Sequence, residues 1–455
     1  MASLADSLAM PDRLVVIGGD AGGMTAATQA RRRQPSLEIV ALERGRFTSY
    51  SACGIPYLVA GDVDSIERLV VRTPQQHRDL HRIDVRTQHE VVGIDVAGRS
   101  LEVRDHARKR TVKLGFDLLH IGTGSRPLRP DLPGIDLEMV HGVQTLDDAA
   151  DLLDHARTAG AQRVVVVGGG YIGLEMAEAF VRRGAVVTVM ESADHVMRTL
   201  DADVAVEIEV AMRRMGIDVR TGVEVQGFEP GRVSSSGGDL DADLVVLGLG
   251  VVPNSELAAD AGLETGSRGA IVVNRRQQTS AEGIYAAGDC CESHHLVSGR
   301  RLHVALGTVA NKQGRVAGIN LAGGYATFAG VVGTAVTKVC STEVGRTGLT
   351  ASEAERDGFL TATATIDSTT RAGYFPGTKP IRVKLVAERG TGRVLGAQIV
   401  GEEGAAKRID VIATALHAHM DVDDLIGLDL GYAPPFSSVW DPIHVAARQL
   451  ADAVT

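Results

Sequence analysis

The feature that most limits how this chain can fold is a short apolar run that opens into closely spaced glycines. Residues 163–167 read Arg-Val-Val-Val-Val, a β-branched run typical of a strand buried in a parallel sheet. The glycines that follow are Gly168, Gly170 and Gly173. This spacing allows a tight turn into a helix whose N-terminus faces a pyrophosphate. The sequence therefore predicts a strand–turn–helix unit that binds a dinucleotide.

A second apolar run completes this unit. Residues 186–190 are followed by Glu191, at about the 20-residue spacing that the motif requires of its acid. An acid at this strand end favours the free 2′-hydroxyl of NADH over the 2′-phosphate of NADPH. Arg198 lies nearby in the sequence and keeps NADPH open as an alternative.

The start of the chain holds an imperfect copy of the same unit. Residues 13–17 run into a glycine-rich turn, a helix is predicted over 24–33, and the next apolar run ends in Glu43, which we expect on a ribose hydroxyl. Asp20 stands where the motif has its middle glycine, so its side chain is expected to point aside from the phosphates. The glycines of this turn are Gly18, Gly19, Gly22 and Gly23. Two units predict two bound dinucleotides.

Size and composition exclude several classes of protein. A chain of 455 residues exceeds one hydrophobic core, so two or three domains are expected. A net charge of −10 argues against a nucleic-acid or anionic-membrane surface. Four cysteines are too few for a disulfide framework, which predicts a reducing, cytoplasmic location. No apolar run reaches the ~18 residues of a membrane span, and residues 1–11 are predicted to be a disordered leader.

One cysteine lies in the stretch 48–61, soon after Glu43. Cys53 is followed by Pro56, which fits the first turn of a helix. Cys53 would then sit at the positive end of that helix, where the pKa of a thiol is lowered and the reactive thiolate is favoured. The alternative is a buried structural cysteine. Because the stretch follows a dinucleotide-binding unit, we expect the thiol to lie against a bound cofactor.

A third glycine-containing segment follows later in the chain. Residues 284–289 read Ile-Tyr-Ala-Ala-Gly-Asp and place the Asp289 carboxylate where it can accept a hydrogen bond from the ribityl chain of FAD. Gly-Asp after a strand is also a common turn. Two more segments belong to the same series along the chain: Thr123 and Gly124, which follow an apolar run, and residues 250–254.

With this order of segments, the chain resembles the flavoprotein pyridine nucleotide–disulfide oxidoreductases over about residues 12–450. Two-cysteine members carry a second cysteine five residues from the first, but Thr48 and Leu58 occupy those positions here. The resemblance is therefore to the single-cysteine branch of coenzyme A disulfide reductases, NADH oxidases and peroxidases, and persulfide reductases. The coenzyme A disulfide reductase-like subgroup fits best, through residues 53–57, 89–91, 373–377, 407–410 and 432–435.

The resemblance implies an α/β fold with two doubly wound Rossmann-like nucleotide-binding domains and a C-terminal mixed α/β dimerisation domain. The implied ranges are a FAD domain over 12–126 and 257–326, an NAD(P)H domain inserted over 127–256, and a dimerisation domain over 330–455. Within the dimerisation domain, apolar and polar residues alternate over 381–400, which predicts a hairpin. Residues 407–420 are predicted to form an amphipathic helix.

The resemblance also implies the reaction: hydride passes from NAD(P)H through FAD to a mixed disulfide at Cys53, and coenzyme A disulfide, or a low-molecular-weight disulfide or persulfide, is reduced. Tyr171 would gate the flavin, Glu175 would lie near the nicotinamide, and Tyr374 and Tyr432 would approach Cys53 of the other subunit of a homodimer. The tyrosines can also be interface packing residues, and Glu175 an ordinary helix acid. The remaining cofactor positions are Gly18, Gly19, Gly22, Gly23, Glu43, Arg44, Thr123, Gly124, Asp289, Gly168, Gly170, Gly173 and Glu191.

Coenzyme A is the first candidate for the thiol carrier. Four residues match positions that contact it in family members: Thr25, Gln29, Arg32 and Ser49. Three other contact positions depart, with Ala52 for an asparagine and His81 and Trp440 for lysines. Losing two cations weakens binding of a 3′-phosphate.

Two other functions stay open. A flavin oxidase or peroxidase would cycle Cys53 through a sulfenic acid, and a redox sensor would bind both cofactors without turnover. Tyr57 after Pro56, together with the C-terminal tyrosines, favours disulfide chemistry. No metal site is predicted, because the histidines form no complete zinc pattern. Adjacent Cys290 and Cys291 are expected to pack without bridging, and Cys340 to be structural.

Overall fold

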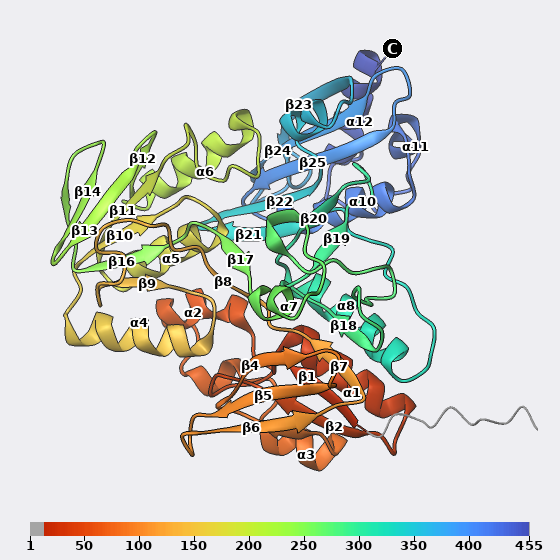
Figure 1. The fold of residues 1–455 in the computed structure, drawn as a ribbon. Coiled ribbons are helices and arrows are strands. Elements are labelled where there is room, and N and C mark those ends of the chain that lie inside the picture. Colours follow the sequence, from red (N-terminus) through yellow and green to blue (C-terminus); the bar gives the residue numbers. More distant parts are fainter. Residues whose placement is uncertain (1–12, 455) are drawn as a thin grey trace, which may run out of the picture.

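The computed structural model describes residues 13–454, and the predicted leader lies outside them. Three five-stranded sheets organise this part of the chain (Figure 1). The first is parallel throughout, in the order β18-β7-β1-β2-β3. Its strands are β1 (Arg13–Ile17), β2 (Glu38–Leu42), β3 (Asp84–Arg86), β7 (Leu118–Ile121) and β18 (Ile284–Ala286). The predicted βαβ unit is confirmed, and its strands β1 and β2 pair in the middle part of this sheet.

Helix α1 (Ala21–Arg33) crosses from β1 to β2 and begins earlier than predicted. It packs closely on α8 (Gly307–Leu321), where a Cβ on Gly314 would lie 2.4 Å from the carbonyl oxygen of Gly22. Only glycine permits this approach. The other elements of this part of the molecule are α2 (Ile55–Ala60), α3 (Pro74–His81), α7 (Glu256–Asp260), the 3-10 helices η1 (Ala52–Gly54), η2 (Ile66–Leu69) and η3 (Ser267–Gly269), and strands β4 (His89–Asp95), β5 (Ser100–Asp105), β6 (Arg110–Gly115), β19 (Glu292–His294) and β20 (Arg301–His303).

The second sheet is also parallel, in the order β12-β11-β10-β16-β9. Two short strands, β8 (Ser125–Pro127) and β17 (Val251–Pro253), pair where the chain leaves and re-enters the first unit, so the second unit is inserted into the first. Its elements are β9 (Val140–Gly142), β10 (Arg163–Val167), β11 (Val186–Glu191), β12 (Asp218–Thr221), β13 (Val225–Glu229), β14 (Arg232–Ser235), β15 (Leu240–Asp241), β16 (Leu244–Leu247), α4 (Leu146–Thr158), α5 (Tyr171–Arg182) and α6 (Ala202–Arg214).

The third sheet is antiparallel, in the order β21-β22-β25-β24-β23, and is covered by α10 and α12. The predicted hairpin is confirmed as β24 and β25, and the predicted helix as α10, which begins slightly earlier and ends at His417. The elements are β21 (Ala335–Val339), β22 (Thr342–Gly348), β23 (Thr361–Thr369), β24 (Pro380–Glu388), β25 (Val394–Gly401), α9 (Ala351–Arg356), α10 (Ala405–His417), α11 (Val422–Ile426) and α12 (Pro442–Val454).

A largely buried polar cluster joins the inserted unit to the C-terminal sheet. Lys384 lies 3.0 Å from the carboxylate of Asp201, which precedes α6, and 2.7 Å from Asp203. Gln398 donates to Asp201 at 2.7 Å and accepts from its backbone N–H at the same distance. Because every partner in this cluster is paired, removing one would leave a buried polar group unsatisfied. The cluster therefore fixes the C-terminal sheet on the inserted unit.

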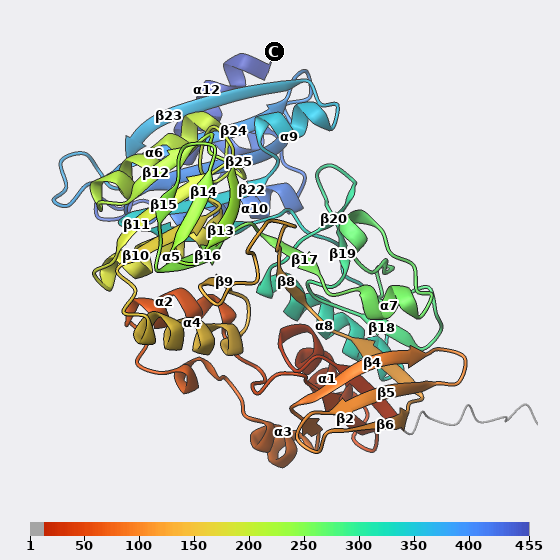
Figure 2. The ribbon, with the colours of Figure 1, turned by 60° about the vertical axis from the view of Figure 1, so that its left-hand side comes forward.

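Short helix α2 lies where the first and second units meet. It packs on α5 and also contacts α4, and Figure 2 shows α2 directly beside α4. Its residues Ile55, Leu58 and Val59 belong to the same buried core as Leu174 and Phe180 of α5. The segment that contains Cys53 therefore lies beside α5 of the second unit, although it belongs to the first unit. No helix among residues 13–454 combines the length and the apolar character that crossing a membrane requires.

We predict that His120, on strand β7 in the interior of the first sheet, makes the fold sensitive to acid. Its side chain is fully buried, and burial lowers the pKa of its imidazole to about 3. The folded pKa lies below the ordinary value of about 6.5, so the unfolded chain binds the proton first. The stabilisation is complete above pH 6.5 and is lost as the pH falls from 6.5 toward 3. Each unit in that window costs about 1.4 kcal/mol.

Melting temperature against pH tests this prediction. His120→Leu should flatten the decline between pH 6.5 and 5, a window worth about 2 kcal/mol. A matched change at an exposed position, His417→Leu, should leave the slope as it is. Parallel curves for His120→Leu and the wild type would show that His120 does not carry the effect.

Candidate active site

Cys53 lies in the turn that leads into α2. The 3-10 helix η1 contains it, and α2 begins two residues later with Pro56 in its first turn, as predicted. The Cys53 side chain is exposed in the single chain, whereas Cys290 and Cys291 are buried and Cys340 is half-buried. Among the described residues, Cys53 is therefore the one cysteine that is open to a substrate.

The prediction that the helix terminus lowers the pKa of Cys53 is wrong. Protein atoms flank the thiol although its sulfur can be reached, and this partial desolvation raises its pKa, with the negative charges of Glu175 and Asp289 adding to the rise. Helix α2 has six residues, and the charges that act most strongly on the thiol are carboxylates. Desolvation and these negative charges favour the neutral thiol over the thiolate.

Glu175 comes from the second unit and connects it to the C-terminal sheet. It lies on α5 and accepts a hydrogen bond from Thr337 of β21. Burial raises the pKa of its own carboxyl, and its charge raises the pKa of Cys53. The structure therefore brings together Glu175 and Cys53, which the sequence separates by more than 100 residues.

We predict that Glu175→Gln makes Cys53 more reactive. Removing the negative charge lowers the pKa of the thiol, so we expect the thiolate fraction at a given pH, and with it the alkylation rate, to rise about twofold to threefold. The rate of iodoacetamide alkylation of Cys53 at pH 8, followed by mass spectrometry, measures the change. Glu178→Gln is the matched control, because Glu178 lies on the same helix and binds the backbone N–H of Cys340 at 2.7 Å. An equal rise in both variants would contradict the prediction.

The two glycine-rich turns have the same geometry. Gly18 and Gly168 take φ values of +98° and +102°, which side-chain-bearing residues rarely adopt. In the first turn, Glu43 accepts from the backbone N–H groups of Gly19 at 2.8 Å and of Gly45 at 2.7 Å. Each carboxylate oxygen retains a lone pair that can accept a ribose hydroxyl.

In the second turn, Glu191 accepts at 2.8 Å from the backbone N–H groups of both Gly169 and Ala193. Glu191 is buried, so its position is fixed by these bonds before any ligand arrives. The predicted acids thus occupy equivalent places in the two units. Arg44, beside Glu43, is exposed.

Both helices fit a pyrophosphate at their N-termini. No side chain caps α1 or α5, so the first-turn N–H groups stay available to phosphate oxygens. Asp20 precedes α1, and its carboxylate accepts a hydrogen bond from the Tyr50 N–H at 3.1 Å. Burial raises the pKa of Asp20 to about 7. The residues present therefore fit FAD in the first unit and NAD(P)H in the second.

Asp289 and the segment after β7 meet at the carboxyl ends of the first sheet. Ser125 donates to the Asp289 carboxylate at 3.0 Å, and Thr123 donates to the carbonyl of Asn254 at 2.5 Å. Gly124 has a φ of +67°. Burial raises the pKa of Asp289, whose charge also acts on Cys53. The structure thus brings Asp289 and Cys53 to one site.

Tyr171 is the first residue of α5 and is half-buried. Thr199 donates to its hydroxyl at 3.4 Å, and Arg346 of β22 donates to the Thr199 carbonyl at 3.0 Å. Burial raises the pKa of the Tyr171 phenol. Thr199 and Arg346 could not be identified from the sequence, because neither belongs to a motif and their contact joins segments 147 residues apart.

The four residues predicted to contact coenzyme A differ in availability. Thr25 donates to Asn311 of α8 at 2.8 Å, and Gln29 packs near Gly318 of the same helix. Arg32 is exposed. Burial lowers the pKa of His81, and the charges of Arg72 and Arg32 lower it further. Ser49 lies 2.9 Å from a buried histidine, His77, which the sequence analysis did not identify.

Tyr374 and Tyr432 lie together on the surface of the C-terminal unit. Partial desolvation and then the neighbouring Tyr374 raise the pKa of the Tyr432 phenol. Tyr374 is 78% exposed, and Phe436 and Trp440 are also exposed nearby in the sequence. An exposed aromatic group of this kind is typical of a surface that another protein covers.

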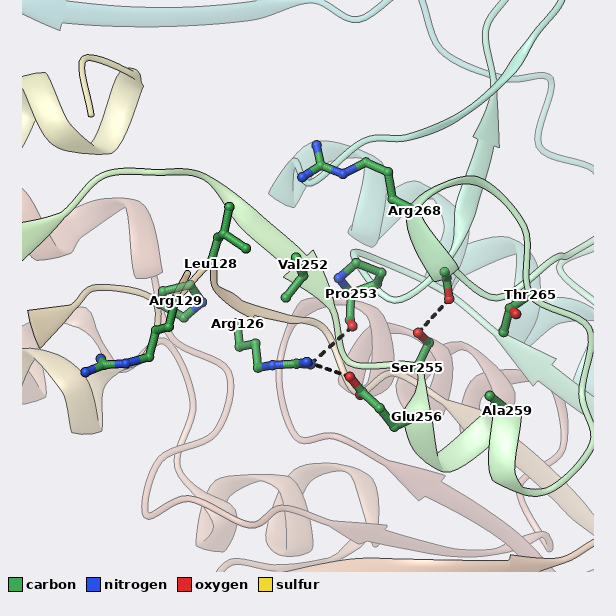
Figure 3. A pocket seen from close by; sticks show the side chains of 12 residues that line it. Arg126, Leu128, Arg129, Val252, Pro253, Ser255, Glu256, Ala259, Thr265 and Arg268 are labelled. Carbon is green, nitrogen blue, oxygen red and sulfur yellow. Dashed lines mark hydrogen bonds and ion pairs between the residues drawn. The ribbon is translucent and has the colours of Figure 1, made fainter. Parts of the chain in front are cut away.

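A cavity of about 490 Å³ lies at the paired strands β8 and β17 (Figure 3). Arg126 on its wall pairs with Glu256 at 2.6 Å, and Ser255 donates to the Gly269 carbonyl at 2.6 Å. None of the predicted site residues lines it.

The two adjacent cysteines, Cys290 and Cys291, are unbridged as expected, with their sulfurs 3.6 Å apart.

Two dinucleotide-binding units that converge on one open cysteine define a nicotinamide- and flavin-dependent oxidoreductase. The chain belongs to the pyridine nucleotide-disulphide oxidoreductase family: the family model matches residues 12–314, and the model of the family's dimerisation domain matches residues 334–442. This confirms the resemblance, the enzyme class and the fold, including a C-terminal unit of the dimer-forming type.

Three known proteins show the group within the family. The NAD(P)H sulfur oxidoreductase (CoA-dependent) of Pyrococcus abyssi is 39% identical over 96% of this chain and 98% of the relative. An NADH oxidase of Methanocaldococcus jannaschii is 36% identical over 96% and 98%. The solved structure of an NAD-dependent persulfide reductase from A. fulgidus is 39% identical, with a TM-score of 0.94 over 97% of this chain and 83% of that one. The chain thus belongs to the group of coenzyme A disulfide reductases, persulfide reductases and NADH oxidases.

Proposed function

We propose that this enzyme uses NAD(P)H to reduce a disulfide or persulfide of a low-molecular-weight thiol at Cys53, with coenzyme A as the first candidate thiol. The observation that carries the proposal is the placement of Cys53. It is exposed, it has no cysteine partner among the described residues, and it lies where the two dinucleotide-binding units meet. A single open sulfur requires its partner sulfur to come from the substrate.

The chain's residues would divide the chemistry as follows. The Cys53 thiolate attacks one sulfur of a substrate R–S–S–R, which forms Cys53–S–S–R and releases the first thiolate, RS⁻. The first unit, with Gly18 and Glu43, would hold FAD, and the second, with Gly168 and Glu191, would hold NAD(P)H. Together the bound cofactors would supply the electron pair that converts the mixed disulfide into the second RS⁻ and the Cys53 thiolate. With a persulfide R–S–SH, the same attack releases hydrosulfide.

Proton transfer follows from the charges around Cys53. The raised pKa of the thiol means that its proton must leave before the attack. Tyr374 and Tyr432 of the partner subunit would donate to the leaving thiolate. Their exposure and their adjacency support this role.

NADH is the proposed reductant. Glu191 is buried and held by two backbone N–H groups, so its carboxylate would face the adenosine ribose. A carboxylate accepts the 2′-hydroxyl of NADH but repels the 2′-phosphate of NADPH. Two relatives support the proposed substrate. One is named a CoA-dependent NAD(P)H sulfur oxidoreductase, and the other an NAD-dependent persulfide reductase.

An NADH oxidase or peroxidase that cycles Cys53 through a sulfenic acid is the second candidate, favoured by the same open cysteine and by the NADH oxidase relative. NADH oxidation by the purified holoenzyme under argon, with coenzyme A disulfide or coenzyme A persulfide, separates the two. We expect one NADH to be consumed per disulfide, and a thiol adduct on Cys53 by mass spectrometry. NADH loss matched by oxygen uptake, and unaffected by disulfide, would favour the oxidase. Absence of any turnover would favour a sensor.

A further inference from the structure

His77 is a buried histidine of the active-site region with no part in the motifs. It lies on α3, whose first turn is fixed by Pro74 and by a reciprocal pair of hydrogen bonds between Thr73 and Gln76. Its side chain is 1% exposed, and its Nε2 lies 2.9 Å from the Ser49 hydroxyl oxygen. Ser49 lies shortly before Cys53 in the sequence, so His77 contacts the segment that carries the reactive sulfur.

The backbone of Ser49 is held in an unusual conformation. Its φ is +47°, in the left-handed region that favours glycine. Its N–H donates to the carbonyl of Gly19 at 2.9 Å, and its carbonyl accepts from Val71 at 2.8 Å. Ser49 is therefore anchored to the phosphate-binding turn on one side and to the segment before α3 on the other. Its side chain stays half-buried and open to a ligand.

The surroundings of His77 decide which of its nitrogens carries the proton. Burial, and then the charges of Arg72 and His81, lower the pKa of the imidazole to about 4, so the ring is neutral near pH 7 and has one N–H. Its Nδ1 is buried and contacts no partner among the described residues. An orphaned buried N–H is rarer than an orphaned acceptor. The proton therefore belongs on Nε2, which donates to Ser49.

This tautomer fixes what Ser49 offers to a ligand. Because the Ser49 oxygen already accepts from His77, its own proton is free to donate, and no other described residue accepts it. We propose that His77 is a positioning residue, which makes the Ser49 hydroxyl a directed hydrogen-bond donor to an acceptor atom of the thiol substrate bound at Cys53. The inference rests on the proposed function and adds to it a residue that selects substrates by an acceptor, such as an amide carbonyl.

Variants at the two positions test the coupling. His77→Phe keeps a planar ring but removes the hydrogen bond, and we expect kcat/KM for coenzyme A disulfide to fall about tenfold, mostly through KM, the size expected for one hydrogen bond. The rate at which NADH reduces the bound flavin should not change. His77→Gln should recover most of the loss, since its amide N–H can reach the same place. Ser49→Ala with His77→Phe should be no worse than Ser49→Ala alone. Equal kcat/KM in His77→Phe and the wild type would overturn the proposal.

A second measurement is independent of turnover. NMR of the holoenzyme labelled with ¹³C at the histidine ring, with the His77 signal assigned by its loss in His77→Phe, reports the tautomer directly. We expect a neutral ring with the proton on Nε2 at pH 7. A proton on Nδ1, or a charged ring, would overturn the inference. If the wild type reduces no disulfide or persulfide, the proposed function fails, and the NMR result still decides the assignment of His77.

Discussion

Cys53→Ser is expected to abolish NAD(P)H-driven reduction of disulfides and persulfides, with kcat lower by about 10³-fold or more. A serine hydroxyl is close to the thiol in size, so the fold should be retained, but it forms no mixed disulfide with a substrate. The residue stands alone in this role because the other three cysteines are buried or half-buried. Steady-state turnover with coenzyme A disulfide under argon measures the effect.

Two controls sharpen this test. Cys340→Ser changes a half-buried thiol in the C-terminal unit, whose pKa burial raises to about 12, and should leave turnover within about twofold of the wild type. Stopped-flow reduction of the flavin by NADH should proceed in Cys53→Ser, since that step precedes the cysteine. If Cys53→Ser still reduces every disulfide offered, the cysteine is not the acceptor and the proposed function is wrong.

Gly18→Ala is expected to prevent assembly of a stable, flavin-containing enzyme. Gly18 has a φ of +98°, and a Cβ there would lie 2.0 Å from the carbonyl oxygen of Gly122. Backbone strain costs on the order of 1–3 kcal/mol, and the clash is with backbone that cannot rotate away. Both costs fall at the turn between β1 and α1, where the pyrophosphate is expected. We predict a loss of about 3 kcal/mol or more and a melting temperature lower by about 10 °C.

Gly61→Ala is the matched control. Gly61 has a φ of +87°, but no heavy atom lies within 4 Å of a Cβ placed on it, so the substitution adds strain without a clash. Its cost should stay near 1 kcal/mol. Flavin absorbance per protein and the melting temperature compare the two variants. If both lose the same amount, strain alone explains the effect, and the close approach to Gly122 is not important.

The sequence by itself determined the individual strands, the glycine turns that follow them and the hairpin of the C-terminal unit. These features rest on interactions between residues close in the chain: a β-branched run favours a strand, and a positive φ selects glycine at Gly18 and Gly168. The position of Pro56 in the first turn of α2 was predictable for the same reason. The acids Glu43 and Glu191 were identified because a fixed spacing places them at the end of a strand.

Only the tertiary structure decided the electrostatics and the supporting contacts of the site. The pKa of Cys53 was predicted in the wrong direction. Desolvation, the largest cause of the rise, arises only when the units pack together, and the carboxylates of Glu175 and Asp289 come from segments far away in the chain. The contact of Ser49 with His77 joins residues 28 apart, and that of Gln398 with Asp201 joins residues 197 apart. Periodicity and spacing report which residues share a local element. Charge and hydrogen bonding depend on distances that exist only once the whole chain has folded.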